Sequence, residues 1–202
     1  MIYLIRHGQT EFNREGRFQG ACDSALTELG AAQARAYGRR LAALVTPETP
    51  IVASPLGRAR ATAGIVRETA GLTGPIALDA RLAEISMGSW DGLTAPEIEA
   101  LAPGFSLGAP PLDWYMRSPD GETYEAFAGR IGDWLADHRN RAEPLVVVSH
   151  GVVSRVLRGL YLGLDKDAGL AQSTPQDCVF RLHEGRVERI ECAALPSEAA
   201  AR

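Results

Sequence analysis

The sequence predicts an α/β fold in three layers (α/β/α), with a mostly parallel sheet in the centre. Short apolar runs alternate along the chain with segments of helical periodicity, the order expected when strands are joined by helices. The most strand-like run, Leu145–Val148, is apolar throughout and lies between two helical segments, as buried parallel strands do. The 202 residues, 46% of them hydrophobic, are enough for one sizeable core.

In the first half of the chain, three short apolar runs are expected to be strands: Met1–Ile5, Ile51–Ala53 and Ile76–Leu78. Apolar residues between positions 29 and 44 fall on one helical face. A second helix is expected from Arg58 to Ala70, where Gly71 ends it. Thr94, followed by Glu97 three residues later, has the form of a capping box and predicts a short helix.

In the second half, helical stripes cover residues 124–138 and 153–164, on either side of the central strand. The segments Val179–Leu182 and Val187–Ile190 resemble a closing hairpin with Gly185 in its turn. We expect one domain over residues 1–195. Within it, the Pro- and Gly-rich segment 102–121 is expected to be a surface excursion over the site, and residues 196–202 a frayed tail.

Composition excludes several classes of function. Lys and Arg total 21 against 25 Asp and Glu, a net charge of -4, so no basic field indicates a nucleic-acid partner. No apolar run approaches the roughly 20 residues that span a bilayer. The N-terminal run is too short and too soon interrupted by charge for a signal peptide, which favours a cytoplasmic protein. The three cysteines are odd in number and widely spaced, so neither disulfides nor a zinc site is indicated.

Two of the four histidines, His7 and His150, lie in matching contexts. Each directly follows the end of a predicted strand, and each is followed by glycine, which lets a backbone turn or a ligand approach closely. Active sites of open α/β sheets form at the carboxyl ends of strands, where such residues meet. Taken singly, each histidine could equally be a capping or core residue bonded to a nearby carbonyl.

Charged residues near other predicted strand ends extend this pattern. Arg6 ends a buried strand, where a guanidinium is costly to desolvate unless an anion meets it. Arg58 opens the helix after Ile51–Ala53, and guanidinium groups and helix N-termini both bind phosphate. Glu84 is expected on a turn-rich loop. Without neighbouring evidence, a solvated surface role would be favoured for Arg58 and for Glu84.

These residues belong to four motifs that occur in a fixed order: Arg6-His7-Gly8-Gln9-Thr10 with Asn13 and the later Leu26–Gly30, Ser54–Thr62, the Glu84 loop with Gly88 and Gly92, and Val148–Gly151. Together they resemble the histidine phosphatase superfamily, also called phosphoglycerate mutase-like. The resemblance runs from residue 3 to about residue 163. The opening motif alone would be a weak match, and the ordered set is a specific one. It implies the phosphoglycerate mutase-like form of the α/β fold.

The resemblance also implies a mechanism. His7 would attack phosphorus and form a phosphohistidine that water then hydrolyses. Arg6, Arg58 and His150 would surround the phosphoryl group and balance its charge, which suffices without a metal or other cofactor. Glu84 would protonate the leaving alkoxide and later take a proton from water.

Three further positions, Asn13, Thr10 and Gln19, match substrate-proximal positions of the family less tightly. We expect Asn13 to contact the phosphate or the loop that carries His7, and we also expect Gly151, next to His150, at the phosphate site. Thr10 is a weaker candidate. Gln19 could as well be an ordinary loop residue.

The superfamily contains hydrolases and mutases, so departures from the mutase pattern matter. Val152 stands where the resembling mutases carry Asn, and Met87 where they carry Tyr. Between residues 93 and 121 the chain has one basic residue, Arg117, which supplies little positive charge to bind a bisphosphate. The chain is therefore more similar to the small phosphatases, which include α-ribazole phosphatase-like and broad-specificity members.

In place of those cations the excursion carries apolar residues: Leu107, Leu112, Trp114, Tyr115 and Met116. Such a wall suits an organic group of low charge, so we expect a small-molecule phosphate ester as substrate. Each of these residues could instead only pack the excursion onto the domain.

Two alternatives remain. One is a cofactor-dependent phosphoglycerate mutase, which would require 2,3-bisphosphoglycerate. The other is a non-catalytic regulatory domain that binds phosphate, which is disfavoured because His7, Glu84 and His150 are all present. A monomer and a homodimer are both open, since the hairpin 179–190 could supply an edge for pairing.

Overall fold

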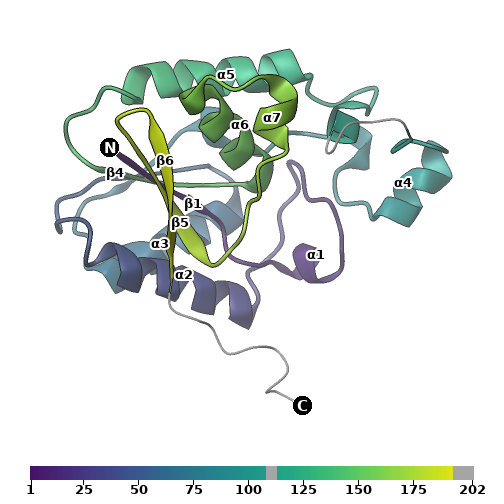
Figure 1. Ribbon diagram of the computed structural model, residues 1–202. Coiled ribbons are helices and arrows are strands. Elements are labelled where there is room, and N and C mark those ends of the chain that lie inside the picture. Colours follow the sequence, from purple (N-terminus) through teal and green to yellow (C-terminus); the bar gives the residue numbers. More distant parts are fainter. Residues whose placement is uncertain (108–112, 193–202) are drawn as a thin grey trace.

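A single six-stranded sheet organises the molecule (Figure 1). The computed structural model describes residues 1–107 and 113–192. In sheet order, the strands are β3 (Ile76–Leu78), β2 (Ile51–Ala53), β4 (Leu145–Ser149), β1 (Ile2–Arg6), β5 (Cys178–His183) and β6 (Arg186–Glu191). All six coincide with apolar runs that predict strands, to within one or two residues.

The four strands β1 to β4 run parallel to one another, and β5 and β6 form an antiparallel hairpin at one edge. The hairpin turns at Glu184 and Gly185, both of which have positive φ. The prediction of a mostly parallel sheet is therefore confirmed. Parallel strands end at the same edge of a sheet, so the residues that follow β1, β2 and β4 are gathered there.

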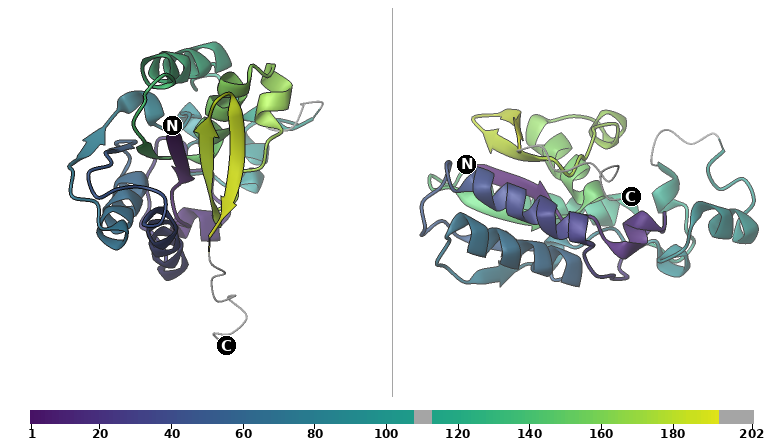
Figure 2. Two further views of the ribbon diagram at one scale, coloured as in Figure 1. Left: turned by 60° about the vertical axis from the view of Figure 1, so that its left-hand side comes forward. Right: turned by 90° about the horizontal axis from the view of Figure 1, so that it is seen from below.

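Helices cover both faces of the sheet, which confirms the three-layer α/β/α prediction. The helices α2 (Glu28–Leu41) and α3 (Gly57–Ala70) lie side by side on one face, and α5 (Tyr124–His138) and α6 (Gly151–Leu162) lie on the other (Figures 1 and 2). Three short helices complete the structure: α1 (Glu11–Arg14), α4 (Ala95–Leu101) and α7 (Lys166–Leu170). The turns α1 and α7 are too short for a periodic signal and were not predicted.

The central strand β1 divides its side chains between two cores. Ile2 and Leu4 pack into the core beneath α5 and α6, while Tyr3 and Ile5 pack into the core with α2 and α3. Successive side chains of a strand point to opposite faces, so a strand covered on both sides is apolar at every position. This accounts for the unbroken apolar runs at the start of the chain and in β4.

The helix α4 and the start of the excursion form a small hydrophobic cluster that is separate from the two main cores. The predicted capping box is present, with Thr94 accepting from the Glu97 backbone and Glu97 from the Thr94 backbone. Behind it, Trp90 and Ile98 are buried and pack against Phe105. In Figure 1, α4 lies at the far end of the molecule from β3 and β2. The expected tail from residue 196 lies outside the described residues.

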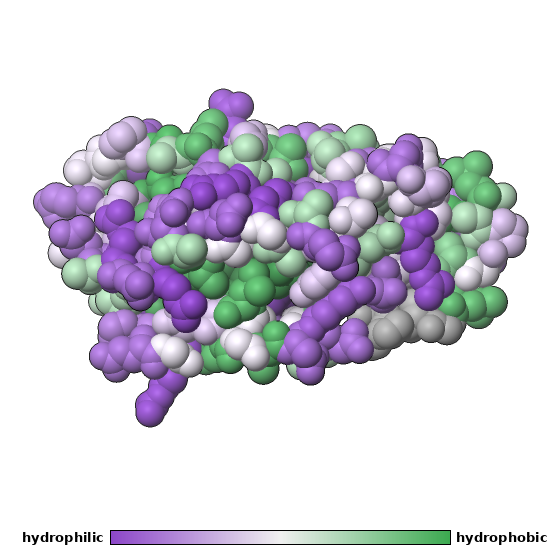
Figure 3. Space-filling model, turned by 90° about the horizontal axis from the view of Figure 1, so that it is seen from above, coloured by the Kyte–Doolittle hydropathy of each residue, from purple (hydrophilic) through white to green (hydrophobic). Residues whose placement is uncertain are grey.

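Polar and apolar residues are mixed on the molecular surface. The face above α5 and α6 is largely hydrophilic, with hydrophobic residues scattered between polar ones (Figure 3). Across residues 1–107 and 113–192, none of the helices combines the length and the apolar character needed to cross a membrane.

Candidate active site

The pairing of β1 with β4 brings the two motif histidines together. Arg6 pairs with Ser149 in the parallel register, so His7 and His150 leave the sheet side by side. The His7 backbone N–H donates to the Ser149 carbonyl at 2.9 Å. The two imidazole rings meet edge to face with their centroids 5.1 Å apart. The equivalent sequence contexts therefore reflect one site at the carboxyl edge of the sheet.

His7 is held in one tautomer. Its Nδ1 lies 2.8 Å from the Gly8 carbonyl oxygen, an acceptor only, so Nδ1 carries the proton and Nε2 keeps its lone pair. The side chain is buried, and the pKa of His7 is lowered well below its usual value, first by desolvation and then by the charges of Arg6 and Arg58. His7 is thus neutral at physiological pH.

His150 lies fully buried beside it. Its Nε2 is 2.7 Å from the Ser54 hydroxyl, which follows β2, and its Nδ1 is buried without a partner among the described residues. Burial, followed by the charge of Arg58, lowers the pKa of His150 well below its usual value. Since a buried polar atom without a partner is costly, Nδ1 marks a place where a ligand can bond.

Arg6 is partly buried and has no carboxylate partner in the described part of the chain. Its Nη1 donates to the Thr174 carbonyl at 2.8 Å, and its Nε is buried and unbonded there. Desolvation lowers the pKa of Arg6, which still remains charged at neutral pH. The predicted need of this guanidinium for an anion is therefore visible in the structure.

Arg58 begins the first turn of α3 and is 1% exposed. Its guanidinium donates to the carbonyls of Gly20 at 2.8 Å and Cys22 at 2.6 Å, and to Asp23 at 3.0 Å. The Asp23 carboxylate also accepts from the Gly57 and Arg58 backbone N–H groups and so caps the helix. This network fixes the plane of the guanidinium group, and its Nε is buried without a hydrogen-bond partner among the described residues.

Glu84 lies in the loop that connects β3 to α4. Its carboxylate accepts from the backbone N–H groups of Val152 at 3.1 Å and Val153 at 3.3 Å, at the N-terminus of α6. There it supplies the cap that the N-cap residue itself does not make. Arg130 of α5, whose role the sequence did not indicate, holds the loop by donating to the Glu84 carbonyl at 3.2 Å and pairing with Glu122.

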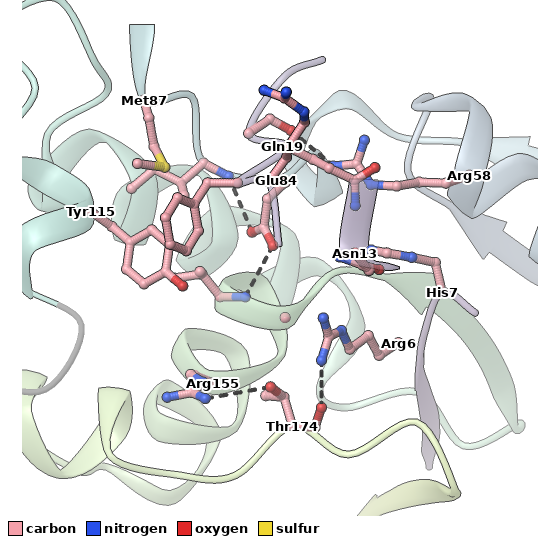
Figure 4. Close-up of a pocket in the computed structure, with 16 residues that line it drawn as sticks. Arg6, His7, Asn13, Gln19, Arg58, Glu84, Met87, Tyr115, Arg155 and Thr174 are labelled. Atoms are coloured by element: carbon pink, nitrogen blue, oxygen red, sulfur yellow. Dashed lines mark hydrogen bonds between the residues drawn. The ribbon is translucent and has the colours of Figure 1, made fainter. Parts of the chain in front are cut away.

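These groups surround one cavity of about 180 Å³ (Figure 4). It is lined by Arg6, His7, Asn13, Arg17, Phe18, Gln19, Gly20, Arg58, Glu84, Ile85, Met87, Tyr115, Gly151, Val152, Arg155 and Thr174. Of the residues predicted for the site, seven line the cavity and His150 lies directly behind His7.

Thr10 is the exception, because it does not line the cavity. Its hydroxyl accepts from the Asn13 backbone N–H at 3.2 Å, and the Asn13 side chain accepts from the Thr10 backbone in return. The pair forms a capping box on α1, which fixes Asn13 at the cavity wall. Gln19 is 7% exposed and is oriented by the Ser24 hydroxyl, which donates to its Oε1 at 3.1 Å.

The prediction of an apolar wall from the excursion is largely wrong. Only Tyr115 of that set lines the cavity. Leu107 is 75% exposed, and Trp114 packs against Phe18 with ring centroids 4.7 Å apart, because the excursion builds its own cluster. Met116 packs on the main core. The remaining member, at position 112, lies outside the described residues.

The cavity also contains two cations that the sequence did not reveal, Arg17 and Arg155. Arg17 is paired with Glu15 at 3.0 Å and Glu97 at 2.9 Å. Arg117, the cation that the sequence did single out, instead donates to two backbone carbonyls of the excursion and does not line the cavity. Arg155 lies on α6, five residues beyond the N-cap residue His150. This spacing in the sequence is the signal that could have placed Arg155 near the site.

In the described ranges there is no cluster of three His, Cys, Asp or Glu side chains suited to a metal ion. The cationic side chains in the lining of the cavity are Arg6, Arg17, Arg58 and Arg155.

Comparison with known proteins gives a consistent result. The model of the histidine phosphatase superfamily (branch 1) matches residues 2–190. The chain is 38% identical over 178 residues to a protein of Erwinia tasmaniensis named probable phosphoglycerate mutase GpmB, covering 83% of this chain and 77% of the relative. It is 36% identical over 177 residues to a glucosyl-3-phosphoglycerate phosphatase of Mycolicibacterium vanbaalenii, covering 82% and 76%.

Among solved structures, Bacillus stearothermophilus YhfR superposes with a TM-score of 0.78 at 32% identity, over 94% of this chain and 95% of the other. The relatives' names include a mutase and a phosphatase, so the names alone do not decide the reaction. The family is decided by the match over nearly the whole chain and by the shared fold. This protein belongs to branch 1 of the histidine phosphatase superfamily.

Proposed function

We propose that this protein is a metal-independent phosphomonoester hydrolase that acts on a small organic phosphate through a phosphohistidine on His7. One observation carries the proposal: a neutral, tautomerically fixed imidazole lines the same cavity as two guanidinium groups, that of the buried Arg58 and that of the partly buried Arg6. A nucleophile without its proton and cations for the phosphoryl oxygens are the two requirements of transfer to histidine.

The nucleophile would be Nε2 of His7, since Nδ1 is committed to the Gly8 carbonyl. As the Nε2–P bond forms, the P–O bond to the leaving group breaks and the electron pair leaves with that oxygen. The imidazole becomes cationic, and the transferred group carries the negative charge that balances it. The fixed Nδ1–H bond to a carbonyl stabilises that positive charge without moving the ring.

Charge on the phosphoryl oxygens would be met by Arg6, Arg58 and His150. The guanidinium groups are already anchored by backbone carbonyls, so little reorganisation is needed when the phosphate binds. The buried nitrogen atoms without a partner among the described residues are Nε of both arginines and Nδ1 of His150. The arginine Nε–H groups would donate to oxygens of the phosphate, and so would Nδ1 of His150 in the tautomer in which its Nε2 accepts from the Ser54 hydroxyl.

Glu84 would act as the proton donor to the leaving oxygen. In the second half-reaction its carboxylate would take a proton from the attacking water, the N–P bond would break, and inorganic phosphate would leave. The carboxyl group lines the cavity and is held by two backbone N–H groups at the start of α6. It is therefore oriented by the same helix that carries His150 as its N-cap.

A second candidate function is the mutase reaction. It is supported by the name of the Erwinia relative and by the additional cations Arg17 and Arg155 in the cavity. Hydrolysis is favoured because Arg17 is already neutralised by two carboxylates, which leaves few free charges to hold a bisphosphate through reorientation.

The test is p-nitrophenyl phosphate hydrolysis by the full chain in excess EDTA, compared with His7→Ala. We expect turnover to persist in EDTA and to fall by at least about a thousandfold in the variant, as for loss of a covalent nucleophile. The mutase alternative predicts negligible hydrolysis, together with interconversion of 2- and 3-phosphoglycerate when 2,3-bisphosphoglycerate is added. Phosphate binding without either reaction would point to a regulatory domain.

A further inference from the structure

Arg155 is the cation of the cavity that the proposed chemistry does not use. It lines the cavity, is partly buried, and forms no ion pair with a carboxylate of the described residues. Its Nη1 donates to the Leu170 carbonyl at 2.7 Å and its Nη2 is 3.5 Å from the Thr174 hydroxyl. These contacts use two of the five N–H donors of the guanidinium.

The other cations of the cavity are accounted for. Arg17 is paired with two glutamates, Arg58 with Asp23, and Arg6 faces the predicted phosphoryl position. Desolvation is the largest cause that lowers the pKa of Arg155, and the charge of Arg6 lowers it further. A partly desolvated, charged arginine on a cavity wall is stabilised when an anion arrives.

Thr174 sets the spacing between the two uncompensated arginines. Its carbonyl accepts from Arg6 Nη1 at 2.8 Å, while its hydroxyl faces Arg155 Nη2. The guanidinium groups thus lie on either side of a single residue, as Figure 4 shows. A ligand that spans them carries two anionic groups a few bonds apart.

Tyr115 adds a neutral donor at the same end of the cavity. Met87, Tyr115 and Arg155 follow one another along the wall opposite His7 and Arg58 (Figure 4). Burial, followed by the charge of Glu84, raises the pKa of Tyr115, so its hydroxyl keeps the proton that it can donate.

We infer that Arg155, with the Tyr115 hydroxyl, forms a second anion subsite that binds a carboxylate of the substrate. One planar guanidinium matches a monoanionic carboxylate, whereas a second phosphate dianion would require further cations. The inference rests on the proposed function and narrows it, because the preferred substrates are phosphate esters of hydroxy acids rather than esters of low charge.

The experiment compares matched substrates that differ only in a carboxylate. The pairs are phosphoglycolate against 2-hydroxyethyl phosphate, and 3-phosphoglycerate against glycerol 3-phosphate, with phosphate release measured for each. The wild-type enzyme is expected to show a higher kcat/KM for the acid of at least one pair. Arg155→Met is expected to reduce this preference about ten- to hundredfold, the range of a hydrogen bond between charged groups. Activity on p-nitrophenyl phosphate, which carries no carboxylate, should fall much less than activity on the acids.

Arg158→Met is the matched control. Arg158 lies on the same helix and holds the same loop, donating to the Ser173 carbonyl at 2.6 Å, but it does not line the cavity. It should leave the carboxylate preference unchanged. Arg155→Lys keeps the charge without the fork and should lose part of the preference, which provides a test if the methionine variant does not fold.

Two results would overturn the inference: a wild-type enzyme with no preference in either pair, or an equal loss on acids and neutral esters in Arg155→Met. The second would show that Arg155 only positions the loop that holds Arg6. Failure of the proposed function is distinguishable, because it would appear as negligible hydrolysis of p-nitrophenyl phosphate, or as hydrolysis that does not depend on His7.

Discussion

At the scale of single residues, the reactivity assigned to His7 comes from its surroundings. Burial and two neighbouring arginines lower its pKa, and the Gly8 carbonyl fixes which nitrogen is free. The motif predicted the residue types and their convergence. The tautomer could not be predicted from the sequence, because it depends on where the backbone of the histidine loop turns.

The role of Glu84 predicts a dependence on the leaving group. In Glu84→Gln, hydrolysis of alkyl phosphates should fall by about 10²- to 10⁴-fold, the usual contribution of general acid–base catalysis. Phosphate esters of p-nitrophenol should lose much less in the first step, because that leaving group needs little protonation.

The measurement is a plot of log kcat/KM against leaving-group pKa for both enzymes. The variant should have the steeper slope. Parallel lines with equal losses would contradict the assignment of Glu84 as proton donor.

Arg17 and Arg155 mark the limit of residue-level prediction. Arg117, the one basic residue that the sequence offers between positions 93 and 121, donates to backbone carbonyls instead of lining the cavity. Arg17 and Arg155, which do line the cavity, come from the loop after α1 and from α6. Neither arginine belongs to one of the four motifs, although Arg155 follows Val148–Gly151 by four residues, so the folded arrangement is what places both at the cavity.

At the scale of elements, the loop that follows β1 and carries His7 (the histidine loop, residues 7–10) packs directly against the N-terminus of α2. A Cβ on Gly8 would lie 2.2 Å from the Gly30 carbonyl oxygen, and a Cβ on Gly30 would lie 2.0 Å from the Gln9 carbonyl oxygen. The loop backbone is also held by Thr62, whose hydroxyl accepts from the Gly8 N–H at 3.1 Å. The position of the nucleophile therefore depends on a close backbone contact between two segments.

This contact predicts that Gly30→Ala is destabilising. The added methyl group meets backbone that cannot rotate away, so we expect the free energy of unfolding to fall by about 1–3 kcal/mol, the usual cost of overpacking. Displacement of the histidine loop should also lower kcat. Urea denaturation and steady-state kinetics measure the two effects.

Gly64→Ala is the matched control, since it lies within α3 and a Cβ there meets nothing within 4 Å. Its higher helix propensity should raise the stability by about 0.5–1 kcal/mol. Equal effects of the two substitutions would show that the Gly30 contact is not tight.

The longer elements were predictable from the sequence because each leaves a periodic pattern. The strands β1 and β4 are buried on both faces, which gives unbroken apolar runs. The excursion was less predictable. Trp114 and Tyr115 were both expected at the cavity. Tyr115 lines it, whereas Trp114 packs against Phe18 and Phe105. In the sequence, an aromatic residue of such a local cluster has the same pattern as one of a binding wall.

At the scale of the whole molecule, net charge and local charge differ. The chain carries -4 overall, yet four arginines line its cavity. Net charge therefore gives no sign of an anion site, because the cations that form it are local. The two histidines that are kept neutral in this positive cavity also affect the stability of the entire fold.

The folded pKa values of His7 and His150 lie below those of the unfolded chain. Above about pH 6.5, both states are neutral and the histidines contribute no pH dependence. Below it, the unfolded chain binds protons that the folded protein does not. The free energy of unfolding should then fall by roughly 1.4 kcal/mol per pH unit for each histidine, until the folded pKa values are reached.

Urea denaturation between pH 7.5 and 5.5 measures this slope in phosphate-free buffer. The His7→Gln, His150→Gln double variant should show a slope smaller by the contribution of both groups. A slope identical to that of the wild-type protein would contradict the assignment of neutral, buried histidines.

The central claim is that the phosphoryl group passes through His7, and trapping the intermediate tests it most directly. The enzyme is mixed with excess p-nitrophenyl phosphate in EDTA and quenched in alkali, where phosphohistidine survives, and its peptides are analysed by mass spectrometry. We predict one phosphoryl group on the peptide that contains His7, formed within the first turnover and absent from His7→Ala. Steady turnover with no phosphorylated peptide, or with the phosphoryl group on another residue, would contradict the account.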